Sequence, residues 1–269
     1  MNFSFATAFT ILFLLGISSS SILPVHGHAS PINYVPKPNE IVDSAEALPD
    51  RVSITFTENP EPRASSLKII NSNNERIDNN DFKVSELDKS VSISLDKSKV
   101  TPGVYTADWL VLSKSDGHIT KGTYVFSVAE NNTTTASQNQ TTDDKQQQQP
   151  QILQANDVTS VYSRNITTDD NVILKFDIVP FKTGQNTFNL TTHYMNGTAV
   201  ENIRNVFLEF NNPDKNLGPI VDTMNKTNVG NYSSTGAFLS QTGNWEVKIT
   251  VQRIGEYDIN QQFNFGIGK

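Results

Sequence analysis

The strongest constraint on the fold of this chain is a two-residue alternation of apolar and polar side chains that recurs along most of its length. In the first half, the stretches RVSITFT, SVSISLD and GTYVFSV each place three apolar side chains on one face: Val52, Ile54 and Phe56, then Val91, Ile93 and Leu95, then Tyr124, Phe126 and Val128. This alternation is typical of half-buried strands in antiparallel sheets. Turn-forming stretches such as NSNNE and TPG separate the strands. The sequence therefore predicts an all-β fold.

The second half of the chain has the same pattern. We expect strands at VILKFDIV, NTFNLTTHY, NVFLEF, WEVKITV and FNFGI, separated by clusters of Gly, Asn and Pro. Several short strands at regular spacing predict a β-sandwich or a Greek-key barrel. No apolar stripe with the 3.6-residue period of a helix interrupts either half.

A polar segment divides the two halves. From Asn131 to Gln151 the only apolar residue is Ala136, so the segment cannot bury enough surface to offset its ordering entropy. We expect a first domain over 28–129, a disordered Gln-, Thr- and Asn-rich linker over 130–156, and a second domain over 157–269. The chain contains no cysteine, which excludes disulfides and thiolate metal sites.

The chain opens with the apolar run FSFATAFTILFLLGI, followed by four serines and Pro24. An apolar segment of about 7–15 residues ahead of small residues is the pattern of a secretory signal. Val25 and Gly27 suit the last positions before a signal-peptidase cut, which predicts a signal peptide over 1–27. The alternative is an uncleaved membrane anchor, although a spanning helix needs roughly 20 apolar residues. A secreted chain would act in a periplasm or at an extracellular cell surface.

Two of the four histidines, His26 and His28, flank the predicted cut. Cleavage after Gly27 makes His28 the N-terminal residue, so that its α-amine and its imidazole Nδ1 can close a chelate ring on one metal ion. A metal competes with protons for an α-amine near neutral pH, because the reference pKa of that group is only about 7.7–8.0.

A second pair of candidate ligands lies in SKSDGHITKG, where Asp116 and His118 are two residues apart. In extended backbone two such side chains point to the same face, and Gly117 between them would leave room for close approach. With His28 they provide three nitrogens and one oxygen. Tetragonal N,O ligation suits Cu(II), which also heads the Irving–Williams order. A DGH tripeptide is also a common turn, in which the aspartate caps its own backbone.

These stretches resemble the CopC family of copper-binding proteins, through HASP, FTENP and GVYTADWLVLSKSDGHITKGTYVFSV. The resemblance covers 28–129 and implies a secreted Greek-key β-barrel that binds Cu(II) through its N-terminal amine and imidazole and a DGH motif. Carried onto this chain, the ligands are His28, Asp116 and His118. Glu58 of FTEN matches a carboxylate near the site and is expected to support the ligands without binding the metal, a role whose loss typically costs 10–100-fold in affinity.

The second domain resembles, through PFKTGQNTFNLTT and GNWEVKITVQR, the Ig-like YtkA-type domains that follow copper-transport proteins of the CopC–CopD kind. This resemblance implies a second Ig-like β-sandwich with a docking or spacing role, and a CopD-like membrane copper transporter as partner. Some CopC members add a Met-rich Cu(I) site. Here the mature chain keeps only Met195 and Met224, both in the second domain. We expect His193 to be a surface residue, and Trp109 and Trp245 to be core residues.

The predicted function is Cu(II) binding outside the membrane, for copper buffering, resistance or delivery, without catalysis. One alternative is a histidine-brace copper monooxygenase, which also uses an N-terminal histidine. Asp116 would, however, fill the position that such an enzyme keeps for exchangeable water and oxygen. The other alternative is a structural cell-surface protein without a metal. The net charge of −7 argues against nucleic acid or anionic lipid as the main partner, so we expect membrane association only through a partner or an uncleaved signal segment.

Overall fold

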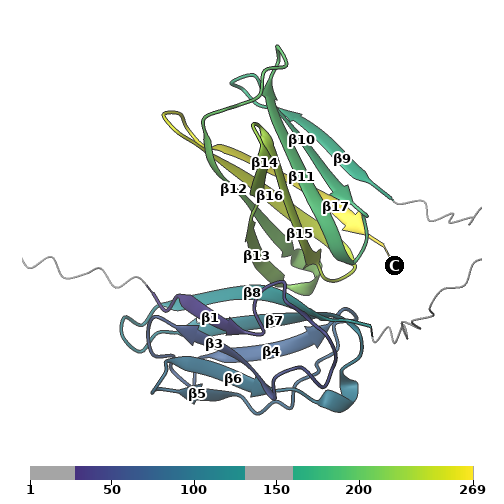
Figure 1. The fold of residues 1–269 in the computed structure, drawn as a ribbon. Helices are drawn as coiled ribbons and strands as arrows, with labels where there is room; N and C mark the ends of the chain where they lie inside the picture. The colour runs from purple at the N-terminus through teal and green to yellow at the C-terminus, as the bar shows by residue number, and fades with distance from the viewer. Residues whose placement is uncertain (1–27, 131–159, 269) are drawn as a thin grey trace, which may run out of the picture.

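The computed structural model describes residues 28–130 and 160–268, which form two β-sandwiches (Figure 1). The predicted signal peptide and all but the first residue of the predicted linker lie outside these ranges. Within them the only helical elements are two short 3-10 turns, η1 at Lys97–Lys99 and η2 at Pro213–Lys215. No helix in the described part of the chain is long and apolar enough to cross a membrane. The prediction of an all-β fold is confirmed.

The first sandwich consists of two four-stranded sheets. One has the order β1-β3-β6-β5 and the other β2-β8-β7-β4. The strands are β1 Pro31–Val35, β2 Ile41–Val42, β3 Arg51–Phe56, β4 Ser66–Asn71, β5 Lys83–Ser85, β6 Ser90–Ser94, β7 Gly103–Leu112 and β8 Ile119–Val128. Neighbouring strands are antiparallel except for β2, which runs parallel to β8. The β7–β8 hairpin is long, and its turn carries the DGH tripeptide.

The core of the first sandwich contains every side chain that the alternation predicts to point inward. All nine of these side chains, from Val52 to Val128, are at most 5% exposed. Trp109 of β7 is also buried and packs edge-on against Phe56, with ring centroids 5.2 Å apart. Burying a side chain of this size stabilises the fold by roughly 1.5–3 kcal/mol. The sheets that carry the candidate ligands therefore rest on a closely packed core.

The second sandwich consists of a five-stranded sheet, β14-β15-β11-β10-β9, and a four-stranded sheet, β13-β12-β16-β17. The strands are β9 Tyr162–Thr167, β10 Val172–Val179, β11 Gly184–Tyr194, β12 Ile203–Asn212, β13 Leu217–Thr223, β14 Asn225–Asn228, β15 Asn231–Leu239, β16 Gly243–Arg253 and β17 Ile259–Ile267. The five predicted strands correspond to β10, β11, β12, β16 and β17. Trp245 is fully buried, as expected, and donates its indole N–H to the carbonyl of Gln241 at 2.9 Å.

The two sandwiches pack against each other, with β13 and β15 of the second lying on β8 of the first (Figure 1). Ile70 of β4 and Val125 of β8 are 6% and 1% exposed, and both belong to the hydrophobic core of the second sandwich. The alternation in GTYVFSV predicts that one face of this strand is in solvent. That expectation is wrong for β8, because the second sandwich covers its outward face.

Candidate metal centre

The turn between β7 and β8 places Asp116 and His118 at one end of the first sandwich. The N–H of Gly117 donates to the carbonyl of Ser113 at 3.1 Å, and the N–H of Ser113 donates to the carbonyl of His118 at 2.9 Å. The expectation of extended backbone from Asp116 to His118 is therefore wrong. Gly117 has a φ of +72°, a conformation that glycine adopts without steric cost. A Cβ at this position would meet nothing within 4 Å, so the turn needs the glycine for its backbone angle and not for space.

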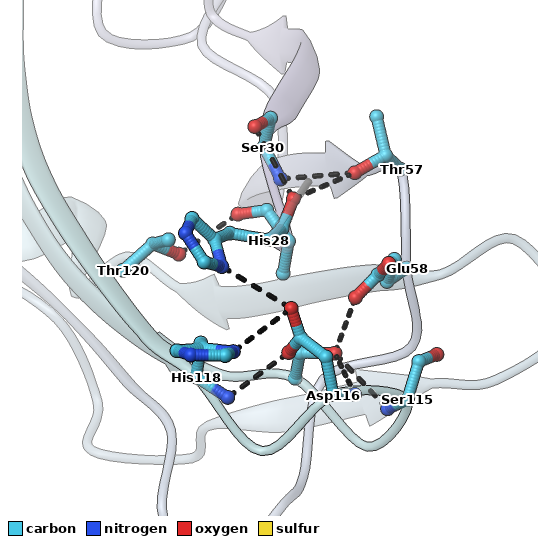
Figure 2. A network of polar contacts seen from close by, with 10 residues as sticks. His28, Ser30, Thr57, Glu58, Ser115, Asp116, His118 and Thr120 are labelled. Atoms are coloured by element: carbon cyan, nitrogen blue, oxygen red, sulfur yellow. Dashed lines mark hydrogen bonds and ion pairs between the residues drawn. The ribbon is translucent and has the colours of Figure 1, made fainter. Parts of the chain in front are cut away.

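Asp116 contacts both histidines through one carboxylate oxygen, as Figure 2 shows. Its Oδ2 is 3.2 Å from Nδ1 of His28 and 3.1 Å from Nδ1 of His118. The two imidazole rings are tilted against each other, with centroids 4.4 Å apart. Within the described ranges, these three residues form the only group of at least three His, Cys, Asp or Glu side chains whose ligand atoms all lie within 4.8 Å of one another. The fold thus brings together two segments that are 88 residues apart in the sequence.

His28 is held in place through its backbone. Its carbonyl accepts hydrogen bonds from the hydroxyls of Ser30 and Thr57, both at 3.2 Å. The next residue, Ala29, is fully buried in the core of the first sandwich, and its carbonyl accepts from the Thr120 hydroxyl at 2.8 Å. Figure 2 shows these hydroxyls around the His28 backbone. The hydroxyls of Thr57, directly after β3, and of Thr120 in β8 therefore anchor the segment that carries His28, a role that the sequence pattern does not reveal.

The electrostatics of the site favour an ionised carboxylate at Asp116. The backbone N–H of His118 donates to Asp116 Oδ1 at 2.9 Å. This hydrogen bond lowers the pKa of Asp116 well below its ordinary value, and contacts with the side chains of His28, Ser113 and His118 lower it further. Because the pKa is depressed, the negative charge is present at neutral pH and disappears only in strongly acidic solution. The oxygen between the imidazoles is therefore available as an anionic ligand at neutral pH.

Glu58 contacts the β7–β8 turn through Ser113 and is only 5% exposed. Its Oε2 accepts a hydrogen bond from the Ser113 hydroxyl, and that same hydroxyl oxygen accepts from the backbone N–H groups of Ser115 at 3.0 Å and Asp116 at 3.3 Å. Glu58 is not in the group of candidate ligands. Its contact with the site runs through Ser113, a residue that the sequence analysis did not single out.

The centre is accessible from solvent. The side chains of His28 and His118 are 55% and 62% exposed, and that of Asp116 is 22% exposed. A set of imidazole nitrogens and one carboxylate oxygen is a ligand set that borderline divalent transition metals accept. An ion at such a position could be taken up and released without opening the core.

The other residues considered for metal binding lie elsewhere. His193 is partly exposed at the end of β11 and belongs to no group of three candidate ligands in the described part of the chain. Met195 is exposed beyond the same strand, and Met224 is buried in the core of the second sandwich.

Comparison with known proteins places a family match within the first sandwich. The family model described as the CopC domain matches residues 34–129. That range contains Glu58, Asp116 and His118 and begins after His28. A protein named YobA from Escherichia coli strain K12 is 35% identical over 125 residues, which are 46% of this chain and 98% of that protein.

Two solved structures are also similar. CopC from Methylosinus trichosporium OB3b is 25% identical, with a TM-score of 0.32 and coverage of 38% of this chain and 94% of that one. PcoC from Escherichia coli, described as a methionine-rich copper resistance protein, is 23% identical, with a TM-score of 0.31 and coverage of 38% and 98%. From the family match and from a relative covered almost completely, we conclude that this chain belongs to the CopC family.

Proposed function

We propose that this protein binds one Cu(II) ion per chain, through the α-amine and Nδ1 of a processed N-terminal His28 together with Asp116 and His118. The observation that carries the proposal is the position of Asp116 Oδ2, which lies 3.1–3.2 Å from one nitrogen of each imidazole. Two donor atoms at right angles around a metal, each about 2.0–2.1 Å from it, are separated by roughly 2.9 Å. The three side chains thus need little movement to share one ion.

The choice of Cu(II) follows from the donor atoms. Three nitrogens and one carboxylate oxygen suit a tetragonal Cu(II) site, and Cu(II) binds such a set more tightly than the other divalent first-row ions. Cu(I) prefers thioether and thiolate sulfur. The chain has no cysteine, and the two methionines in its described part are in the second sandwich. Membership of the CopC family supports copper as the cargo.

The physiological role that fits best is to hold Cu(II) outside the membrane, in a periplasm or at the cell surface. An exposed site suits buffering, resistance, or delivery to a CopD-like membrane transporter, since the ion can be exchanged directly with a partner. A histidine-brace monooxygenase is less well supported, because the Asp116 carboxylate lies between the histidines where such an enzyme needs an open position for oxygen. We propose a binding protein without catalytic activity.

A Cu(II) titration of the processed protein tests this function. Protein that begins at His28 should bind one equivalent in competition with a chromophoric chelator, and His193→Ala should bind with unchanged affinity. A metal-free structural protein would bind only weakly and without fixed stoichiometry. A second tight equivalent that disappears in His193→Ala would mean that the second sandwich also carries a site.

We further propose that Glu58 positions the metal-binding turn through Ser113. Glu58→Leu removes the acceptor and should weaken Cu(II) binding roughly 10–100-fold, the usual cost of losing a residue that orients a ligand. Glu58→Gln keeps a carbonyl oxygen for the Ser113 hydroxyl and should restore most of the affinity. Glu75→Gln, at an exposed glutamate that accepts from the Asn71 amide far from the turn, is the matched control and should have no effect.

Equal losses in Glu58→Gln and Glu58→Leu would contradict this role. That result would indicate that the charge of Glu58 acts on the metal directly. The EPR spectrum of bound Cu(II) distinguishes the two roles, because a positioning residue leaves the set of ligand atoms unchanged.

A further inference from the structure

The outward face of the β2-β8-β7-β4 sheet has the composition of a protein-binding surface. Its centre is apolar: Ile70 and Val125 are buried in the core of the second sandwich, and Val104 packs against the same core. None of these three side chains belongs to the core cluster of its own sandwich. Their burial therefore depends on the second sandwich, and separating the two would return this apolar surface to water.

Polar groups around this centre are paired across the boundary. The hydroxyl of Thr106 donates to the Ser240 hydroxyl at 3.0 Å, and both residues are at most 1% exposed. At a second point, the N–H of Gly218 donates to the Thr123 hydroxyl at 3.2 Å. An apolar centre with paired polar groups is the usual anatomy of a specific protein interface. The buried Thr106 hydroxyl, whose partner Ser240 lies across the boundary, also helps to fix the register of the contact.

We propose that this face, centred on Ile70, Val104 and Val125, is a docking surface whose partner is the second sandwich (residues 160–268), and that the two bind each other without a covalent link. The role of the second sandwich is then to occupy this face permanently. The candidate metal ligands take no part in the contact, so a partner that exchanges copper must approach the end of the first sandwich at the β7–β8 turn. The docking itself does not rest on the proposed copper function.

The proposal is tested by cutting the chain between the two sandwiches and measuring whether the fragments stay associated. The experiment needs no metal ion. A specific protease site is inserted at residues 140–145 of the full-length protein, and the cleaved product is run on size-exclusion chromatography at roughly micromolar concentration. We expect the two fragments to co-elute. In the same cleaved protein, Val125→Asp should weaken their association at least about a hundredfold, because it places an unpaired charge in an apolar contact. Ile254→Asp, at a 57% exposed residue of the β16–β17 turn, is the control and should leave the fragments together.

A second variant, with a measurement of folding, distinguishes loss of association from unfolding of a fragment. Ile70→Asp changes a different strand of the same face and should also separate the fragments, while circular dichroism melting shows that each fragment is folded. Folded wild-type fragments that elute separately would overturn the proposal. So would fragments that still co-elute in both Val125→Asp and Ile70→Asp, because the contact would then lie elsewhere.

Discussion

Replacing Asp116 with asparagine is expected to lower Cu(II) affinity at least about a hundredfold, since the loss of a residue that merely orients a ligand already costs roughly 10–100-fold. The substitution removes the negative charge that contacts both imidazoles. It keeps a side-chain carbonyl that can accept the hydrogen bond that Asp116 now receives from the His118 N–H. The turn should therefore keep its shape while the site loses its anionic ligand.

The measurement for this variant is a competition titration together with a thermal unfolding curve. We expect the affinity to fall while the melting temperature of the metal-free protein changes little. Asp50→Asn is the matched control, because that carboxylate is 94% exposed and forms an ion pair with Lys97, away from the site. An unchanged affinity in Asp116→Asn would show that Asp116 is an ordinary turn residue. His118→Ala should cause a loss of similar size by removing an imidazole.

The second large effect should come from the N-terminus. Protein that retains Gly27 ahead of His28 has the same side chains but a peptide nitrogen in place of the α-amine. The amine and the imidazole bind as one chelating unit, so we expect the Cu(II) affinity to fall by two or more orders of magnitude and the EPR spectrum to change. Affinity that is unaffected by the added residue would contradict this ligand assignment.

Acetylation of the α-amine of the processed protein provides a matched control, because it blocks the amine without moving His28. It should reproduce the effect of the added glycine. Binding should also weaken as the pH falls. The pKa of Asp116 is lowered by the His118 N–H, so its carboxylate stays ionised and the loss on acidification should come from protons that compete for the nitrogen ligands.

Much of the fold could be predicted because one face of most strands is buried within its own sandwich. Val52, Ile54 and Phe56 face the core exactly where a period of two places them. The prediction failed where burial depends on the other sandwich. The alternation places Val125 on the solvent-facing side of its strand, yet Val125 is only 1% exposed. The sequence of a single strand does not indicate which other surface will cover its outer face. The sequence pattern also predicts no strand at β1, β2, β4 and β5 of the first sandwich or at β9, β13, β14 and β15 of the second, most of which are short.

The candidate ligands could be named from the sequence, but not the way in which they meet. Asp116 and His118 come together through a tight turn with Gly117 at positive φ, whereas their spacing alone suggests two side chains on one face of an extended strand. The hydroxyl of Ser113, which joins Glu58 to the turn, could not be predicted, because serine is common in turns of every kind. The hydrogen bond between Glu58 and Ser113 joins segments that are far apart in the chain. A local sequence pattern does not predict such a contact.

The most direct test of the account is anomalous diffraction from crystals of the processed protein grown with one equivalent of Cu(II). Data collected on both sides of the copper absorption edge locate the ion without any assumption about its ligands. We predict a single copper peak within bonding distance of the α-amine and Nδ1 of His28, of Asp116 and of His118. A copper peak elsewhere on the protein, or a peak from which the N-terminal amine is absent, would contradict the account.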